Sequence, residues 1–211
     1  MKEQEFKRVI GISGSPRKCG NTDLLLDEAL KAARSKGAKT KKVILSELIF
    51  SPCMECENIR KDGVCILKDD LRMLYSEIEN SDGIILASPI FFGSVSAQTK
   101  MMIDRFQCLW LAKNIFKTCK PQKRKVGAFI CIEASTRKNF FENAKSIVKN
   151  FFATIGASYE KELLCSGVDK KGAVKKNKGC LSKAFEIGEN IACPRPKGRR
   201  ASKTGSGIGK G

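Results

Sequence analysis

The sequence predicts an α/β domain of three layers (α/β/α), in which helices cover both faces of a doubly wound, five-stranded parallel sheet. Strand-like and helix-like segments alternate strictly along the chain, which is the order that βαβ units produce. The central strand-like segments are almost wholly apolar, as buried parallel strands are. The length of 211 residues suits one domain with a sizeable core.

The first half of the chain supplies three of the expected strands and two of the helices. Short apolar runs predict strands over 7–13, 41–45 and 83–87, the last with the sequence GIILA. The first helix is expected over 21–35 because its leucines and alanines form one stripe and Gly37 supplies a stop signal. A second helix is expected over 69–80, after a long connection over 46–68. A connection of that length inside a compact domain is usually functional.

The second half continues the same alternation. A helix is expected over 96–111, a buried strand over 126–132 and a helix over 139–155 that ends at Gly156. The last strand, 158–165, is interrupted by Glu160, Lys161 and Glu162, which places it near an edge of the sheet. A helix over 180–191 closes the domain. We therefore expect a domain over 1–193 and a basic, disordered tail over 194–211, where the composition changes to Gly, Ser, Lys and Arg.

The charge and the composition exclude several classes of function. The chain has 40 Lys and Arg, 22 Asp and Glu, and no His, which gives a net charge of +18. Without His there is no Ser-His-Asp triad, no Cys-His pair and no His metal ligand. Catalysis must use carboxylates, amines, thiols, backbone groups or a cofactor. A basic surface attracts anions such as phosphorylated cofactors, acidic partners or nucleic acid, although it can also be solvated without a partner.

The N-terminal residues lack the layout of a signal peptide, and no run of apolar residues is long enough for a membrane helix. A cytoplasmic protein without a membrane partner is therefore expected. The ten cysteines are then more often thiols, metal ligands or redox groups than disulfides. Cys108, Cys131 and Cys165 have apolar neighbours and are expected to be ordinary core residues.

The loop after the first strand has the composition of a phosphate site. It runs from Ser13 into the first helix, whose free N–H groups and partial positive charge suit an anion. It matches neither a Walker loop nor a dinucleotide fingerprint, and its hydroxyl groups suit a terminal monophosphate such as that of FMN. An ordinary strand-to-helix turn is the alternative. The predicted phosphate-binding residues are Ser13, Ser15, Arg17, Lys18, Asn21 and Thr22.

Two segments resemble one known family. The segment GSPRKCGNTDLLL is similar to the phosphate loop of the NADPH-dependent FMN reductases and iron–sulfur flavoproteins, a flavodoxin-like superfamily. The segment SPIFFGSVSAQTKMMIDR, over 88–105, is similar to that family's second flavin loop. The resemblance covers about residues 7–191. It implies a flavodoxin-like fold, FMN as cofactor, NAD(P)H as electron donor, and a homodimer or tetramer in which a second subunit covers the flavin.

The resemblance also implies which loops hold the isoalloxazine ring. The residues after the third strand would line it: Pro89, Ile90, Phe91, Phe92, Gly93 and Ser94. Because successive residues point in opposite directions, we expect one of the two phenylalanines to be in the core. Many relatives have Tyr where Phe91 stands, so its hydroxyl is absent here. After the fourth strand, Ser135 and Thr136 are expected to bond the polar edge of the ring. Cys131 and Arg137 have the spacing of a tyrosine-phosphatase loop, but Glu133 between them would repel phosphate.

The long connection holds three cysteines with metal-ligand spacing. Cys53, Cys56 and Cys65 form a C-x2-C-x8-C pattern, and a C-x2-C pair on a loop can direct two thiolates to one metal. Iron–sulfur flavoproteins, which the chain resembles, carry a compact set of four cysteines in this loop, and the position of their third cysteine is Ile59 here. Three alternatives stay open: a 4Fe–4S cluster with a fourth ligand such as Asp62, a zinc site, or a loop of thiols without metal.

These observations predict an FMN-dependent NAD(P)H oxidoreductase that passes electrons to a quinone, a flavin, a metal ion or a protein. Hydride transfer needs no acid–base side chain, which agrees with the missing His. One alternative is an electron carrier with FMN and a Cys-ligated 4Fe–4S cluster. The other is a nucleic-acid-binding module. Since the sequence lacks a basic face interleaved with aromatic residues, only nonspecific contacts through the tail are expected. The apolar helix over 96–111 suits either the core alone or a subunit contact as well.

Overall fold

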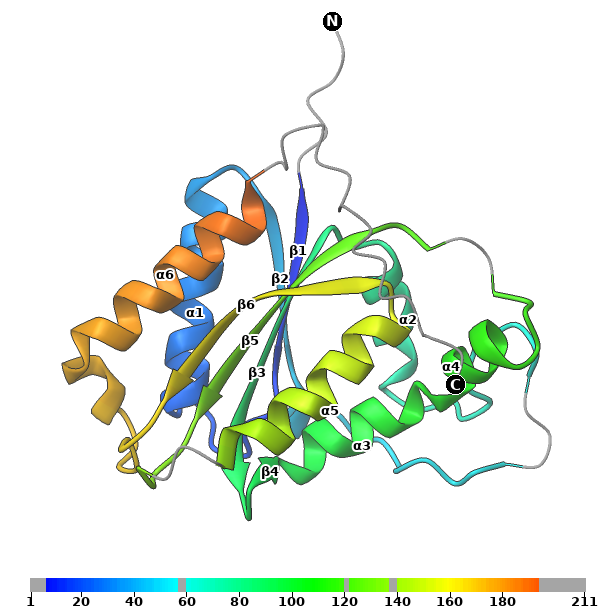
Figure 1. The fold of residues 1–211 in the computed structure, drawn as a ribbon, viewed down its shortest axis with the longest axis horizontal. Helices are drawn as coiled ribbons and strands as arrows, with labels where there is room; N and C mark the ends of the chain where they lie inside the picture. The colour runs from blue at the N-terminus through cyan, green and yellow to red at the C-terminus, as the bar shows by residue number, and fades with distance from the viewer. Residues whose placement is uncertain (1–6, 57–59, 120–121, 137–139, 194–211) are drawn as a thin grey trace, which may run out of the picture.

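The computed structural model describes residues 7–56, 60–119, 122–136 and 140–193. Five parallel strands run through it in the order β2-β1-β3-β5-β6 (Figure 1). Their bounds are Arg8–Ser13 (β1), Lys39–Ile44 (β2), Gly83–Phe91 (β3), Lys125–Ile132 (β5) and Ala157–Cys165 (β6). The predicted five-stranded parallel sheet is confirmed, and so is the edge position of the last strand. The predicted tail, 194–211, lies outside the described residues.

A sixth strand was not predicted. The two-residue strand β4 (Ser94–Val95) pairs with the end of β3 in antiparallel orientation. The chain reverses at Phe92 and Gly93, whose φ angles are +51° and +73°. A two-residue hairpin turn with both φ angles positive matches the twist of the strands that it joins. This hairpin extends β3 beyond the predicted end at Ala87.

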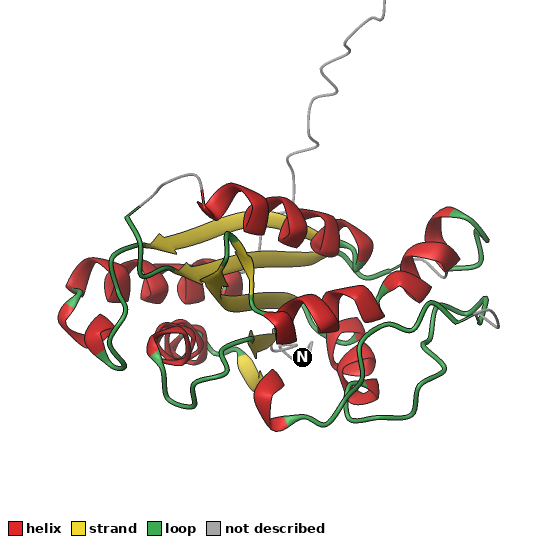
Figure 2. Ribbon diagram, turned by 90° about the horizontal axis from the view of Figure 1, so that it is seen from below, coloured by secondary structure: helices red, strands yellow, loops and turns green. Residues whose placement is uncertain are grey.

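Helices cover both faces of the sheet, as Figures 1 and 2 show. On one face lie α1 (Asn21–Ser35) and α6 (Lys178–Ala192), and on the other α2 (Arg72–Glu79), α3 (Ala97–Arg105), α4 (Gln107–Asn114) and α5 (Phe140–Thr154). Two short 3₁₀ turns complete the described elements, η1 (Leu45–Glu47) and η2 (Ala173–Lys176). Since side chains alternate along a strand, Ile84 and Leu86 of β3 join one core cluster while Ile85 and Ala87 join the other.

The helix predicted over 96–111 is divided in two at Phe106. This residue ends α3 and precedes α4. Its buried ring stacks on Tyr75 with 4.4 Å between the centroids and meets the edge of Phe151 at 5.2 Å. The ring contacts fix Phe106 in the core, and the helix axis changes direction there. Sequence periodicity did not reveal this break, because the apolar pattern continues on both sides of it.

One expectation about the cysteines is wrong. Cys165 is not a lone core thiol but forms a disulfide with Cys180, and the two Cα atoms are 6.3 Å apart. None of the other eight cysteines, all within the described residues, forms a disulfide. The pairing joins the end of β6 to the first turn of α6, so it depends on how these two elements pack. None of the helices in the described part of the chain is long and apolar enough to cross a bilayer.

Candidate active site

A pocket opens at the carboxyl ends of β1, β3, β5 and β6, where open parallel sheets bind their ligands. Seven of the predicted residues line it: Ser15, Arg17, Asn21, Thr22, Pro89, Ile90 and Phe91. The structure adds seven lining residues that were not among the predicted binding residues: Pro16, Gly20, Ile132, Ala134, Val168, Asp169 and Lys171. The last three come from the segment after β6, whose only sequence signal was a run of lysines. Seven predicted residues are not among the lining residues: Ser13, Lys18, Phe92, Gly93, Ser94, Ser135 and Thr136.

The first loop leaves the N-terminus of α1 open. Gly20 occupies the N-cap position, and no side chain caps the helix. The N–H groups of a first helical turn have no partner within the helix, so these groups are available to a ligand. Gly20 donates its own N–H to the Arg17 carbonyl at 3.0 Å. A Cβ atom at Gly20 would come within 2.9 Å of that oxygen, so a larger residue would displace the loop.

Asp23 holds the same loop in place through hydrogen bonds. Its carboxylate is buried in the first turn of α1 and accepts hydrogen bonds from the Ser13 hydroxyl and from the Cys19 N–H, the latter at 2.9 Å. Cys19 adopts a φ of +54°, a conformation that favours glycine, and the bond to Asp23 holds it there. Lys42 Nζ lies 3.7 Å from Asp23 and offsets its charge. Ser13 therefore organises the loop through Asp23, a residue that sequence analysis did not consider.

Asn21 and Lys18, both predicted phosphate ligands, direct their side chains to other parts of the chain. The Asn21 side chain donates to the Lys170 carbonyl at 2.9 Å and accepts from the Val174 N–H at 3.3 Å. Lys18 Nζ forms an exposed ion pair with Glu47 at 3.0 Å, outside the pocket. Arg17 stays at the pocket and donates to the Asp169 carbonyl at 3.3 Å.

Buried hydroxyl groups fix the second loop against the first. The Ser96 hydroxyl donates to the Gly14 carbonyl at 2.6 Å and lies 2.9 Å from the Thr99 hydroxyl, while the Ser96 N–H donates to Ser88 Oγ at 3.0 Å. Gly14 is packed so closely that an added Cβ would overlap Thr99 Oγ1. The ends of β1 and β3 are therefore held in a fixed relation, which positions Pro89 and Ile90 beside the phosphate loop.

The β3–β4 hairpin projects from the layers. Phe91 is 45% exposed and Phe92 is fully exposed, so the prediction that one of them is in the core is wrong. The reason is the tight turn between β3 and β4, which places both phenylalanines in a hairpin outside the packed core. Phe91 still lines the pocket, and the Asn143 side chain supports the turn through a 3.1 Å bond to the Gly93 carbonyl.

The third loop contributes apolar atoms in place of the predicted hydroxyl groups. Ile132 and Ala134 line the pocket, while the Ser135 carbonyl accepts a bond from the Gly167 N–H at 3.2 Å. Between the two lining residues, Glu133 is 3% exposed, and its two carboxylate oxygens have no hydrogen-bond partner among the described residues. Cys131 is wholly buried in strand β5, and burial raises the pKa of its thiol. It is therefore not placed as a phosphatase nucleophile.

The cysteine loop is anchored by Arg105, which is fully buried. Its guanidinium group donates to Cys65 Sγ at 3.2 Å, to the Ser51 carbonyl at 2.8 Å, and to both carboxylate oxygens of Asp69. Cys53 is exposed and Cys56 is half-buried.

The described residues contain no group of three or more Cys, Asp or Glu that could hold a metal ion. Asp62, considered as a fourth ligand, pairs with Arg60, and this hydrogen bond lowers the pKa of Asp62 to about 2. Ile59 lies outside the described residues. The arrangement of Cys53, Cys56 and Cys65 in this structure does not fit a metal site, so metal ligation by them stays a prediction from the sequence.

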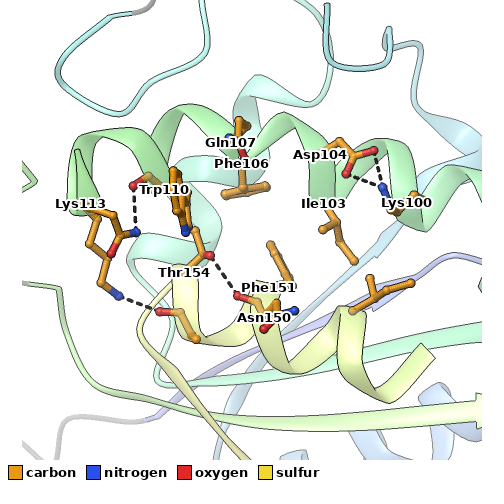
Figure 3. A pocket seen from close by; sticks show the side chains of 13 residues that line it. Lys100, Ile103, Asp104, Phe106, Gln107, Trp110, Lys113, Asn150, Phe151 and Thr154 are labelled. Carbon is orange, nitrogen blue, oxygen red and sulfur yellow. Dashed lines mark hydrogen bonds and ion pairs between the residues drawn. The ribbon is translucent and has the colours of Figure 1, made fainter. Parts of the chain in front are cut away.

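A second hollow, of about 550 Å³, lies between α3–α4 and α5 (Figure 3). Ile103, Phe106 and Phe151 form its apolar floor, and Trp110 stands at its side. Charged groups at its rim are paired internally, as in the 2.8 Å contact between Lys100 and Asp104. It contains none of the predicted site residues.

Comparison with known proteins agrees with the architecture. A family model described as NADPH-dependent FMN reductase matches residues 7–158. An iron–sulfur flavoprotein of Methanocaldococcus jannaschii is 39% identical over 145 residues, which cover 69% of this chain and 71% of the relative. An iron–sulfur flavoprotein of Methanosarcina thermophila is 35% identical over 128 residues, which cover 61% of this chain and 64% of that protein.

Solved structures share the fold at low sequence identity. An NAD(P)H:quinone oxidoreductase from Methanothermobacter marburgensis superposes with a TM-score of 0.70 at 14% identity, covering 91% of this chain and 98% of that one. A flavone reductase gives a TM-score of 0.67 at 21% identity, covering 88% of this chain and 62% of that one. With this fold, and with a family match that spans most of the described residues, the chain belongs to the NADPH-dependent FMN reductase family of flavoprotein oxidoreductases.

Proposed function

We propose that the pocket at the carboxyl ends of β1, β3, β5 and β6 binds FMN, and that the chain passes electrons from NAD(P)H through it to an acceptor. The acceptor classes are those expected from the sequence: a quinone, a free flavin, a metal ion or a protein. The uncapped N-terminus of α1, beside Ser15 and Thr22, is the observation that carries this proposal. It offers an anion site next to an apolar pocket, which is what a flavin mononucleotide requires.

The phosphate end of the pocket fits a monophosphate. The first-turn N–H groups of α1 provide donors without a charge of their own, and the hydroxyl groups of Ser15 and Thr22 are within the same pocket. Arg17 adds a positive charge at the mouth, while Asp23 is occupied by loop contacts and faces Lys42. The side chain of Asn21 is excluded from this set because it binds the segment after β6.

The ring end of the pocket is apolar. Pro89, Ile90 and Phe91 line one part of it, and Ile132 and Ala134 line another. These residues exclude water from one side of a flat ring, and Phe91 can pack against it. When bound, FMN supplies the two-electron chemistry. The part of the protein is to hold and orient the ring, and no acid–base side chain is required for hydride transfer.

The alternative function is that of an electron carrier with FMN and a 4Fe–4S cluster. The names of the relatives from Methanocaldococcus and Methanosarcina support it. The positions of the side chains do not add support, because the described residues contain no group of three or more Cys, Asp or Glu that could hold a metal ion. No step of the proposed function therefore passes through a cluster.

We also propose that the chain works as a homodimer or tetramer. The hollow between α3–α4 and α5 and the partly exposed Trp110 support a subunit contact on this face, where the sequence suggested one. A cytoplasmic location and nonspecific nucleic-acid contacts through the tail stay predictions from the sequence.

The test is purification without oxygen, followed by a visible spectrum and separate measurement of flavin, iron and acid-labile sulfide. The proposal predicts a yellow protein with equimolar FMN, which NAD(P)H bleaches. A colourless protein that takes up no added FMN would contradict the proposal. Stoichiometric iron and sulfide together with FMN would favour the electron-carrier alternative.

A further inference from the structure

The segment between β6 and α6, residues 166–179, is a loop closed covalently at its base. The Cys165–Cys180 disulfide joins the last residue of β6 to the first turn of α6. We call this segment the closed loop. It contains the turn η2 and carries five lysines, at 170, 171, 175, 176 and 178.

The closed loop forms one side of the candidate FMN pocket. Val168, Asp169 and Lys171 line the pocket directly. Opposite them, the phosphate loop binds the closed loop through Arg17, which reaches the Asp169 carbonyl, and through Asn21, which reaches the backbone at 170 and 174. The position of the closed loop and the shape of the phosphate site are therefore linked by the same side chains.

The two sulfur atoms differ in their surroundings. Cys165 is buried, and its partner in the sheet is Ile132, which lines the pocket. Cys180 is half-buried at the start of α6, next to the N-cap residue Asn177. A reagent in solution therefore meets Cys180 before Cys165. None of the other eight cysteines in the described residues forms a disulfide, so this pair is the one disulfide there.

We propose that Cys165 and Cys180 are a reversible dithiol–disulfide pair that sets how tightly the closed loop holds FMN. A dithiol reductant opens the bond by exchange: one thiolate attacks the Cys180 sulfur, forms a mixed disulfide and releases Cys165 as a thiol. The second thiol of the reductant then displaces Cys180 and leaves with its partner as a disulfide. The protein gains two electrons and two protons, and a disulfide oxidant reverses the process.

Opening the bond removes the covalent tie but leaves the hydrogen bonds to Asn21 and Arg17. Local opening of a surface loop depends on the few contacts that hold it, so the reduced loop is open for a larger share of the time. Its lysines are already exposed, but trypsin needs an opened backbone around them, so cleavage becomes faster. One side of the pocket is also lost more often. The effect on FMN rests on the proposed function, whereas the effect on proteolysis does not.

The first experiment follows the loop itself. Full-length protein is treated with oxidised or reduced glutathione or with dithiothreitol, alkylated, and analysed by mass spectrometry for Cys165 and Cys180. Samples are also digested briefly with trypsin. We expect the pair to be protected from alkylation only when oxidised, and cleavage over 170–178 to be about tenfold faster in reduced protein and in Cys180→Ser. The exposed Cys193→Ser, outside the loop, should behave as wild type in both states.

The second experiment measures the Kd of FMN by quenching of flavin fluorescence in the same samples, after removal of the reagents. We expect about tenfold weaker binding in reduced protein and in Cys180→Ala. The proposal is overturned if both thiols are alkylated after oxidation, or if cleavage or FMN affinity does not change with the redox state. If no form binds FMN while cleavage over 170–178 still depends on the redox state, the FMN site is wrong and the redox-dependent loop stands.

Discussion

Arg105 and Asp69 form a two-point ion pair beneath the cysteine loop, with Nη1–Oδ2 and Nη2–Oδ1 distances of 2.6 and 3.1 Å. The guanidinium side chain has no exposed surface. It joins the end of α3 to the segment before α2 and also binds Ser51 and Cys65. A single buried cation therefore holds both ends of the long connection that the sequence marked as functional.

Removing this cation should destabilise the fold strongly. In Arg105→Gln the half-buried Asp69 carboxylate loses its ionic partner, and the buried bonds to Ser51 and Cys65 are lost with it. We expect the free energy of unfolding to fall by about 3–5 kcal/mol. Urea denaturation measures the change. The matched control is Lys100→Gln, which removes an exposed ion pair with Asp104 and should cost about 0–0.5 kcal/mol. Equal losses in the two variants would contradict the role assigned to Arg105.

The same pair predicts how stability depends on pH. Burial acts to raise the pKa of Asp69, but hydrogen bonds from Arg105 and from the Ser51 N–H outweigh it, so the pKa lies below its ordinary value of 3.8. A depressed folded-state pKa stabilises the protein above pH 3.8, and this contribution is lost as the pH falls through the folded-state pKa. Urea midpoints measured at falling pH should decline less steeply below this point in Asp69→Asn than in wild type. Parallel curves would show that Asp69 does not contribute.

Adjacent basic residues in the phosphate loop should differ in their effect on FMN. Arg17 lines the pocket, whereas Lys18 pairs with Glu47 away from it. We expect Arg17→Gln to weaken FMN binding about threefold to tenfold and Lys18→Gln to leave it unchanged. Fluorescence titration of the apoprotein measures both. If Lys18→Gln has the larger effect, the orientation of the loop is wrong.

The close contact between Gly14 and Thr99 can be tested with a pair of substitutions. The first should introduce a steric clash, and the second should relieve it. In Gly14→Ala the new methyl group overlaps Thr99 Oγ1, and we expect a loss of about 1–3 kcal/mol in unfolding free energy. Thr99→Ala removes that oxygen, so the double variant should be more stable than the sum of the single effects. A double-mutant cycle by urea denaturation checks this. Strict additivity would contradict the close approach.

Replacing Glu133 with an apolar residue should stabilise the protein. Within the part of the chain that the structure describes, its two buried oxygens have no hydrogen-bond partner, and an unpaired buried polar group costs about 1–3 kcal/mol. We expect Glu133→Met to raise the free energy of unfolding by an amount in this range, as thermal denaturation would show. The exposed Glu142→Met is the control and should change little. A destabilised Glu133→Met would indicate that the carboxylate has a partner in solution.

The sequence determined the architecture and the place of the site. Alternating apolar strands and amphipathic helices predict a parallel sheet covered by helices on both faces, because each element has to bury its own apolar face. The flavodoxin-like arrangement of the strands came from the family resemblance. The hydroxyl-rich turn before α1 predicted one end of the pocket, since its chemistry is local to consecutive residues. Ser15, Arg17 and Thr22 were found in this way, and all three line the pocket.

Only the tertiary structure decided which distant groups meet. The partner of Arg105, the pairing of Cys165 with Cys180, and the closure of the pocket by the loop at 166–179 depend on how helices and strands pack. So does the fate of Asn21, whose side chain binds a segment about 150 residues further along the chain. Local patterns report which face of an element is apolar, but they carry no information about the relative position of two side chains brought together by packing.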